Sequence, residues 1–397
     1  MQNIKNRYIT LENKEVLGFF ERGAICLYFF LTYFEPYFNG IIGPALKYYI
    51  FFLVFVLIYN CKKAKLQEYH CYFYLWFFYK FLSVIWTNDY TVFSNHILSH
   101  FGMWLLFFAL TIREIDKKTI TCIYKTIWLA SGVIGVLATF FSQSYHGTVE
   151  GRQVLLFMGQ EIDPNNQAAF LLVGIAISLY YLLNKVNRKI KTLSVFVLLF
   201  NLYGMFLTAS RGGLVSIVVV ITLLLLFGRK NSLKYKIITV CTIIILGLIF
   251  YYIAVNYLPR TVINRLFDFD SYEDGGGRVV LWKAALDFIS EDINFIFGAG
   301  WGAVDTNNVF SQRYHNTFLS MWSDVGIIGL SLFFLPVIMC TIKMAKEKNI
   351  LVVTLLFAGL VPSFFVDAIN KRFFWSPIIF LFMEWNNVRK LKNNEVD

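Results

Sequence analysis

The sequence predicts an all-α membrane protein whose chain crosses the bilayer many times. Of its 397 residues, 57% are hydrophobic and only 15% are charged, whereas an average soluble domain is roughly 45–50% apolar and about 25% charged. The apolar residues lie in blocks of about 16–22, the length that an α-helix needs to cross roughly 30 Å of hydrocarbon. About twelve such blocks fit the chain. This pattern excludes an ordinary soluble enzyme.

The predicted spans are apolar blocks separated by polar or basic connections. The first block follows a charged stretch that includes Glu21 and Arg22, and no small-residue cleavage site follows it. We therefore expect this block to remain as a signal anchor. The predicted spans are, in chain order, Gly23–Phe34, Ala45–Tyr59, Cys71–Trp86, Leu98–Ile112, Ile120–Phe141, Ala168–Leu183, Thr192–Thr208, Gly213–Phe227, Ile237–Val255, Phe318–Ile342, Ile350–Val366 and Phe373–Trp385.

The distribution of lysine and arginine predicts the orientation, because cytoplasmic loops carry the excess of both residues. Alternate connections are basic, whereas Thr87–Ile97 contains no lysine or arginine and Ser142–Gln167 contains only Arg152. We therefore expect both termini in the cytoplasm, with Lys371-Arg372 as an exception on the outer side. This topology accounts for the net charge of +11. Since no basic patch is interleaved with aromatic residues, we expect no nucleic-acid partner.

One predicted outer connection is much longer than the others and defines the domain organisation. Residues 257–317 form a loop of about 60 residues, whereas most connections in compact proteins have about 2–6. The loop separates residues 1–256, with the first nine predicted spans, from residues 318–397, with the last three and a cytoplasmic tail. No internal repeat of the kind that transporters commonly carry is present. We therefore expect the function to reside in the long loop.

The centre of this loop predicts an amphipathic helix over Arg278–Ser290. Its apolar residues, among them Trp282, recur at spacings of about three and four residues. The glycines Gly275–Gly277 precede it, and free N–H groups at a helix start favour an anion beside Arg278. The alternative is a flexible linker that leaves this arginine in water.

Two further segments of the loop suggest chemistry. Phe297–Gly302 is a glycine-rich turn, with Gly300 and Trp301, that allows backbone to approach a ligand; without a preceding strand it does not indicate a nucleotide-binding unit. His315 and Asn316 stand immediately before the next span. A histidine at this position can accept and release a proton near neutral pH, and the alternative is a histidine that only anchors the helix at the interface.

Arg211 lies in the short outer turn between two strongly apolar spans. Arginines at such depth are rare and usually face a polar cavity or an anionic ligand. A guanidinium also matches phosphate with two parallel hydrogen bonds, which an ammonium does not. The alternative is an arginine whose side chain reaches out to the interface.

A polar stretch, Glu161–Gln167, precedes the sixth predicted span. Asp163 or Asn165 is a candidate cap for that helix. The amides of Asn165 and Asn166 are equally candidates for binding sugar hydroxyls.

The remaining charged residues give weaker signals. Lys80 and Asp324 lie within predicted spans, where ionisable groups are commonly functional, although the glycines near Asp324 also indicate close helix packing. His96 and His100 have zinc-like spacing but lack the glutamate and a third ligand. The acidic run Asp268–Asp274 does not match the calcium-loop spacing, so a solvated acidic face is favoured. No metal site is expected.

Several of these motifs occur in a particular order across about residues 150–335. They are Asp163-Pro164-Asn165, Ser210-Arg211-Gly212, Gly277-Arg278 with Trp282, Gly298–Gly302, and His315-Asn316 with Gly326–Leu330. In this order and membrane setting, the sequence resembles the O-antigen ligase and Wzy polymerase superfamily. The first five predicted spans resemble this superfamily only in hydropathy.

The resemblance implies a GT-C-like helical fold and a membrane glycosyltransferase that needs no metal or cofactor. Such an enzyme takes a glycan from undecaprenyl pyrophosphate, on the outer face of the bacterial cytoplasmic membrane, and joins it to an acceptor hydroxyl with inversion. It implies that Arg211 and Arg278 bind the pyrophosphate and that His315 is catalytic. The position of Asp324 is more often a glutamate in relatives. The residues implied to bind substrate or acceptor are Asn165, Asn166, Asn316, Trp282 and Trp301, and those implied as structural or polar support are Asp324 and Gly300.

Three functions remain open at this stage. A polysaccharide polymerase, which joins lipid-linked repeat units of O-antigen, capsule or exopolysaccharide, is favoured by the Gly-Arg…Trp and His-Asn motifs. A ligase that transfers finished glycan to lipid A-core, the acceptor in lipopolysaccharide, is the alternative, and a flippase or other transporter of lipid-linked oligosaccharide is an alternative of another class. The expected partners are the lipid-linked glycan and the bilayer, with a flippase and a chain-length regulator of the same pathway as candidates.

Overall fold

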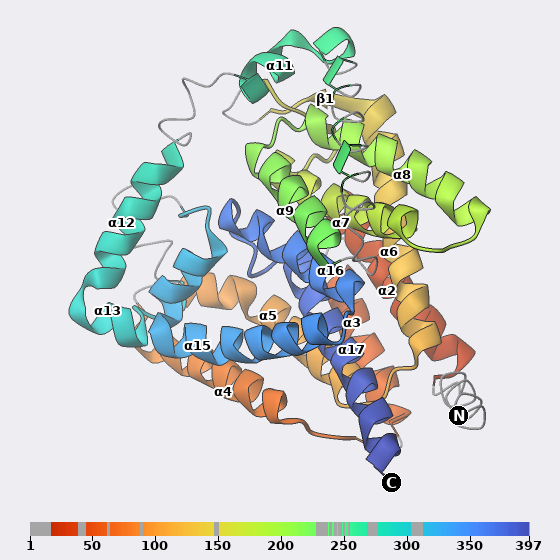
Figure 1. The fold of residues 1–397 in the computed structure, drawn as a ribbon. Coiled ribbons are helices and arrows are strands. Elements are labelled where there is room, and N and C mark those ends of the chain that lie inside the picture. Colours follow the sequence, from red (N-terminus) through yellow and green to blue (C-terminus); the bar gives the residue numbers. More distant parts are fainter. Residues whose placement is uncertain are drawn as a thin grey trace.

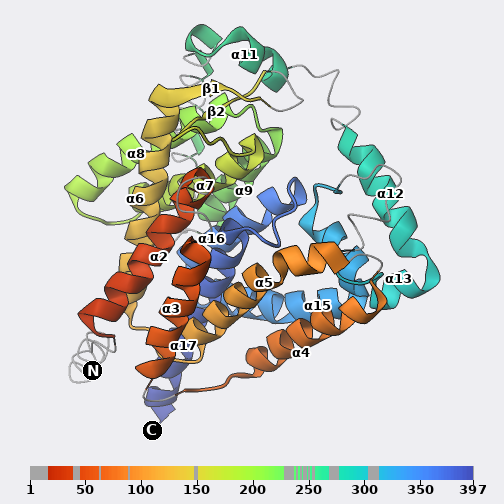
Figure 2. The same cartoon turned by 180° about the vertical axis from the view of Figure 1, so that it is seen from behind.

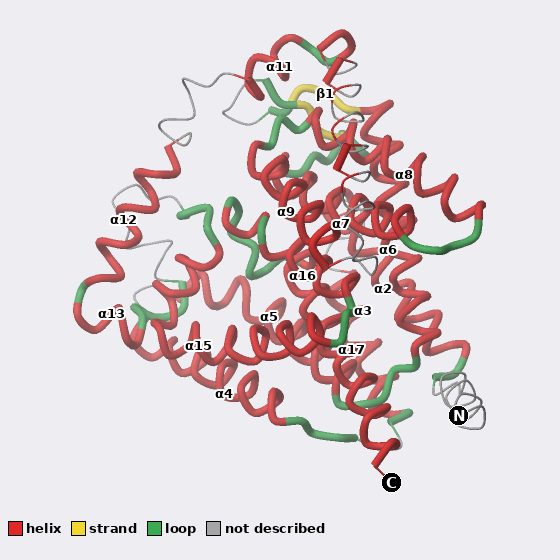
Figure 3. Tube along the Cα trace, in the orientation of Figure 1, coloured by secondary structure: helices red, strands yellow, loops and turns green. Residues whose placement is uncertain are grey.

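The computed structural model describes residues 17–38, 45–61, 64–87, 90–146, 151–227, 255–267, 277–302 and 313–396, with isolated positions between 237 and 252. Within these residues the chain is almost entirely helical, and strands form only a short hairpin (Figures 1 and 3). The elements are α2 (Phe19–Phe38), α3 (Ala45–Tyr59), α4 (Glu68–Leu82), η1 (Ser83–Trp86), α5 (Tyr90–Thr111), α6 (Lys117–Phe141), β1 (Ser142–Ser144), β2 (Gln153–Leu155), α7 (Pro164–Leu183), α8 (Arg188–Leu207), α9 (Arg211–Phe227), α11 (Arg260–Phe267), α12 (Arg278–Ser290), α13 (Asp292–Phe297), α15 (Thr317–Lys346), α16 (Ile350–Leu360), η4 (Pro362–Phe364) and α17 (Arg372–Val396).

The helices support an integral membrane protein. By length and composition, five of the described helices can cross a bilayer, and shorter apolar helices accompany them. Those five segments are Phe93–Thr111, Lys117–Phe141, Pro164–Leu183, Arg188–Leu207 and Thr317–Lys346. The total of about twelve spans stays a prediction. The predicted ninth span, Ile237–Val255, and the acidic run Asp268–Asp274 lie wholly or largely outside the described residues.

Helix α7 occupies the centre of one half of the molecule and packs against α6, α8, α9 and α16. The Asp163 carboxylate caps the start of α7, where it accepts hydrogen bonds from the first backbone N–H groups of the helix. Asp163 was one of the two candidate caps in the sequence. Small residues let the neighbours approach closely: a Cβ at Gly174 would stand 2.2 Å from Nδ2 of Asn201. Asn201 in turn donates to Ser131 Oγ at 3.1 Å. Small and polar residues of this kind commonly join membrane helices.

The other half is built around α15, which packs along α4 and against α17, as both views show (Figures 1 and 2). Helix α15 bends sharply at Gly326, whose φ of 61° and ψ of −174° are accessible only to glycine. A Cβ there would stand 2.1 Å from the carbonyl oxygen of Ile296. The glycine-rich segment after α13 therefore packs directly into the bend of α15.

Within the basic pair at 371–372, the exception in the charge pattern, Arg372 forms an ion pair, whereas Lys371 is exposed. Arg372, at the start of α17, is 8% exposed and forms a two-pronged contact with the Glu35 carboxylate of α2. Its Nη1 also donates to the Tyr28 hydroxyl at 3.2 Å. Because the charge is neutralised inside the bundle, this arginine has little effect on the orientation signal.

Several elements were not predicted from the sequence. Strands β1 and β2 pair antiparallel, with Gln143 opposite Val154, and helices α11 and α13 lie in the predicted outer loop. Each is short, so its periodicity is too brief to stand out in the sequence. The division at residues 256 and 317 stays a prediction.

Candidate functional site

The starts of α7 and α9 meet at one end of the bundle and are fastened there by hydrogen bonds. Ser210 Oγ, just before α9, donates to Asn165 Oδ1 in the first turn of α7 at 2.9 Å. Gln167 Oε1 accepts from the Leu155 backbone N–H of β2 at 2.9 Å. A Cβ at Gly213 would stand 3.1 Å from the Ala168 Cβ, so the two helices touch. The positive ends of both helix dipoles therefore lie together.

Helix α11 lies across this end of the bundle, near the β hairpin and above α9 in Figure 1. Arg211 Nε and Nη2 both donate to the carbonyl oxygen of Arg265, at 3.3 and 2.9 Å. On the other side, a Cβ at Gly151 would stand 2.7 Å from the Thr261 carbonyl oxygen, and φ is +80° there. Since Gly151 packs directly on α11, the neighbouring residue Arg152 is brought to the same place.

The start of α12 joins the group through Phe365, which follows η4. A Cβ at Gly212 would stand 2.6 Å from the Phe365 ring, and the Arg278 guanidinium carbon lies 5.8 Å from the centroid of the same ring. The rings of Trp282 and Phe365 are 6.4 Å apart. Gly277, before α12, has φ of 81°, and no side chain of the described residues caps this helix. The first N–H groups of α12 therefore lack the side-chain cap that α7 has.

The arginines brought together here, Arg152, Arg211, Arg265 and Arg278, are named the arginine cluster. Burial lowers the pKa of Arg265 to about 10, and the charges of Arg152 and Arg211 act in the same direction. Burial also lowers the pKa of Arg152 and of Arg278; Asp163 opposes this, while neighbouring arginines reinforce it. The cluster thus holds cations close enough to repel one another in a poorly hydrated place, which favours a bound anion.

His315 stands at the edge of the cluster in a constrained position. Its backbone is left-handed, with φ of 49°, between Tyr314, whose carbonyl accepts from Trp282 Nε1 at 3.1 Å, and Asn316, which caps α15. His315 is exposed to solvent. The surrounding chain nevertheless desolvates the imidazole enough to lower its pKa, and the charge of Arg278 lowers the pKa further. Asp163 and Asp367 act in the opposite direction. The imidazole is therefore held in its neutral form near pH 7.

The structure thus brings Arg211, Arg278 and His315, which the sequence predicted as site residues, to one place. The amides differ in their surroundings. Asn165 Oδ1 accepts from Ser210, whereas Oδ1 of Asn166 is buried and has no hydrogen-bond partner among the described residues. Asn316 Oδ1 accepts from the backbone N–H groups of the first turn of α15. It therefore has a structural task as a cap.

Trp301 occupies a different environment. It is 3% exposed, and the centroids of the Trp301 and His100 rings are 4.7 Å apart. Lys80 Nζ lies 4.6 Å from the centroid of the Trp301 ring. The Lys80 ammonium also contacts His100 Nε2 at 3.1 Å. Because these buried contacts cover the indole, it has little surface left for a sugar. Trp301 therefore has a packing role in this structure, and sugar binding by it stays a prediction.

Gly300 and Asp324 hold the turn that carries Trp301. A Cβ at Gly300 would stand 2.7 Å from the Thr87 Cα, and the Asp324 carboxylate accepts from the Gly302 backbone N–H at 3.1 Å. The supporting role of both residues in the proposed site stays a prediction. Among the described residues, no group of three or more His, Cys, Asp or Glu side chains is placed to hold a metal ion.

Sequence reasoning missed Arg152 and Arg265 as members of the site. A signal existed for Arg152, since it is the only lysine or arginine in the predicted outer connection Ser142–Gln167. Arg265 carried no such signal, because its position on α11 depends on tertiary contacts with Arg211 and Gly151.

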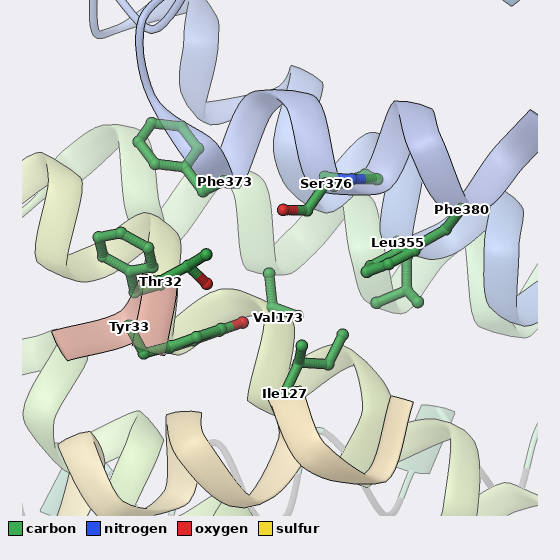
Figure 4. A pocket seen from close by; sticks show the side chains of 10 residues that line it. Thr32, Tyr33, Ile127, Val173, Leu355, Phe373, Ser376 and Phe380 are labelled. Carbon is green, nitrogen blue, oxygen red and sulfur yellow. The ribbon is translucent and has the colours of Figure 1, made fainter. Parts of the chain in front are cut away.

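A small pocket inside the bundle lies apart from these charges. Ten residues of α2, α6, α7, α16 and α17 line it, among them Tyr33, Phe170 and Phe373 (Figure 4). None of the lining residues is charged. Its apolar walls do not suit an anionic group.

Comparison with known proteins supports the resemblance. Residues 195–334 match the family model described as O-antigen ligase, a range that includes Arg211, Arg265, Arg278 and His315. No curated protein matches the chain. Over residues 195–334, the chain is therefore similar to the family described as O-antigen ligase, in agreement with the resemblance of its motifs.

Proposed function

We propose that this protein is a membrane glycosyltransferase of the Wzy polymerase type. It joins undecaprenyl-pyrophosphate-linked repeat units on the outer face of the bacterial cytoplasmic membrane. The observation that carries the proposal is the arginine cluster beside His315, built from segments far apart in the sequence. The family match over residues 195–334 supports the same class of enzyme.

The arginine cluster suits a diphosphate leaving group. When the glycosidic bond breaks, the electron pair of the bond between the anomeric carbon and the phosphate oxygen stays on the diphosphate. Guanidinium groups already in place stabilise this charge without reorganisation in a poorly hydrated site. The uncapped first turn of α12 adds backbone N–H donors next to Arg278.

His315 is proposed as the general base. The acceptor hydroxyl oxygen forms a bond to the anomeric carbon while its proton moves to the imidazole. The lowered pKa of His315 suits this step, because the neutral ring is the form that accepts a proton. Such a base contributes about 10²–10⁴-fold to the rate. Attack from the face opposite the lipid carrier inverts the anomeric centre.

Sugar contacts are proposed for Trp282 and Asn166. Trp282 is partly exposed next to Arg278, and Asn166 carries the unpartnered oxygen described above. Asn165 and Asn316 act through the helix starts that they fasten. These assignments place the sugar between α7 and α12.

A ligase is the second candidate, because the matching family model is described as O-antigen ligase. The same arginine cluster and base serve both reactions, which differ in the acceptor. A polymerase uses the glycan of another lipid-linked repeat unit, whereas a ligase uses lipid A-core.

The deciding experiment is turnover of a defined undecaprenyl-pyrophosphate repeat unit by the purified full-length chain in detergent. Elongated lipid-linked glycan is the expected product. Transfer only to added lipid A-core would instead assign a ligase, and transport in vesicles without any transfer would assign a transporter. We expect His315→Ala and Arg278→Ala to abolish product while the protein remains inserted in the membrane. Normal product from either variant would contradict the role given to that residue.

A further inference from the structure

The four arginines of the cluster are not equivalent. Arg211 directs both Nε and Nη2 to one backbone acceptor, the carbonyl oxygen of Arg265 in the last turn of α11. The last carbonyls of a helix have no partner within the helix, so Arg211 caps α11. The Nε edge of its guanidinium, one of the edges that can bind a phosphate through two parallel hydrogen bonds, is therefore already engaged.

Arg152 has the opposite character. Its backbone is fixed, because its carbonyl accepts from the Tyr145 N–H at 3.0 Å and the preceding Gly151 packs on α11. Its side chain is only 9% exposed, yet its Nε has no hydrogen-bond partner among the described residues. A charged donor that is buried without an acceptor is costly. A ligand is the natural source of that acceptor.

Two more unpartnered donors accompany Arg152. Within the described part of the chain, Nε of Arg265 and Nε2 of Gln167 are also buried without hydrogen-bond partners. Gln167 is fully buried, and its Oε1 already binds β2, the strand that directly follows Arg152. Unsatisfied buried donors of this kind require an explanation, and an anion with several oxygens would satisfy the Nε groups of Arg152 and Arg265, whose charges act on each other.

We propose that Arg152 and Arg265 bind one phosphate of the diphosphate, while Arg278 and the start of α12 bind the other. In this arrangement Arg211 is a positioning residue that holds α11, and through it Arg265, in place. The inference rests on the proposed function for the identity of the anion. It changes the role of Arg211 from a direct ligand to a support, and it adds two ligands.

The test is calorimetric titration of the full-length chain in detergent with inorganic pyrophosphate and, separately, with inorganic phosphate. Arg152→Gln is expected to weaken pyrophosphate binding by about tenfold or more, since a charge-assisted contact is lost. In the separate titration, inorganic phosphate can still bind at Arg278 and the start of α12, so its affinity should change much less. Arg211→Lys keeps one donor for the Arg265 carbonyl, so it should weaken pyrophosphate binding less than Arg152→Gln does. Arg260→Gln, on the exposed side of α11, is the matched control.

The outcomes separate this inference from the proposed function. If the unmodified chain fails to bind pyrophosphate, the proposed function itself is contradicted. If pyrophosphate binds and Arg152→Gln binds it equally well, or Arg211→Lys loses as much affinity as Arg152→Gln, only the division of roles is overturned. Should Arg152→Gln unfold, Arg152→Lys replaces it and is expected to show a smaller but measurable loss. Competition by phosphatidylglycerol vesicles as strong as that by pyrophosphate would assign the site to lipid headgroups and overturn the inference.

Discussion

Arg372 and Arg152 are both almost fully buried arginines, but their surroundings differ. Arg372 lies between α2 and α17 with both prongs of its guanidinium on Glu35 and a further contact to Tyr28. Arg152 lies among other arginines and has an Nε with no partner among the described residues. The first is neutralised by a carboxylate in direct contact, whereas the second has the charge of Asp163 nearby but keeps an Nε without a hydrogen-bond partner among the described residues.

This difference distinguishes charges that serve the fold from charges that serve a ligand. A buried ion pair completed within the chain leaves nothing for a ligand to neutralise, and removing one partner exposes the other to the full penalty of burial. A cluster of like charges raises the free energy of the empty protein, and a bound anion lowers it. Stability and binding measurements should therefore respond in opposite ways at the two places.

The largest effect on stability is expected at the Arg372 pair. Arg372→Gln leaves the Glu35 carboxylate without its partner inside the bundle and should lower the free energy of unfolding by about 3–5 kcal/mol. Denaturant or thermal unfolding in detergent measures this. The double variant Glu35→Leu with Arg372→Met should recover much of the loss, since an apolar pair of similar volume replaces the ions. If Arg372→Gln alone were as stable as the unmodified chain, the Arg372–Glu35 ion pair would not serve the fold.

Arg278→Gln should behave in the reverse manner. It removes a guanidinium from the proposed leaving-group site, so turnover should fall by about 10²–10³-fold, the usual effect of losing a preorganised donor. Because burial of the Arg278 charge and repulsion from Arg265 and Arg211 together outweigh its attraction to Asp163, thermal stability without ligand should stay the same or rise. Turnover and thermal unfolding are measured on the same preparation, with Arg260→Gln as the control. A large loss of stability would mean that Arg278 serves the fold as Arg372 does.

Lys80 offers an intermediate case, because its hydrogen-bond contact is to a histidine, while the Asp324 and Asp367 carboxylates act on it through longer-range electrostatics. An ammonium only donates, so His100 Nε2 accepts from it and Nδ1 carries the proton towards the His96 carbonyl. Lys80→Met leaves that nitrogen unpaired and should lower the free energy of unfolding by about 1–3 kcal/mol. Pyrophosphate affinity should remain unchanged. If Lys80→Met lost pyrophosphate affinity while keeping its full stability, Lys80 would instead belong to the binding site.

The sequence predicted local features well and tertiary ones unevenly. The bounds of α3 and α12 and the cap of α7 by Asp163 follow from patterns within one helix, so they agree with the structure. The grouping of Arg211, Arg278 and His315 was expected only from the order of family motifs.

The misses have physical reasons. Arg265 joins the site through its backbone carbonyl. Every residue has such a carbonyl, so the residue type gives no signal for this contact. The surroundings of Trp301 were not foreseen either, because its loop lies against α4 and α5, where Lys80 and His100 contact the indole. Burial of a loop residue depends on what packs over it, and this is decided by distant segments.

The smallest expected effect tests how the surroundings of His315 set its protonation. The base must be neutral to accept a proton, so activity should fall as the pH drops through the pKa of His315, which lies below its ordinary value of 6.5. Arg313 contributes to that lowering and lies 3.9 Å from the Asp367 carboxylate, which acts in the opposite direction. Arg313→Gln removes the first influence and releases the second, so the acidic limb of the kcat/KM profile should move to higher pH by less than about one unit. Asp367→Asn should move it to lower pH. If both variants leave the limb unchanged while activity is retained, the group that titrates is not His315, and the arginine cluster would have to act with another base.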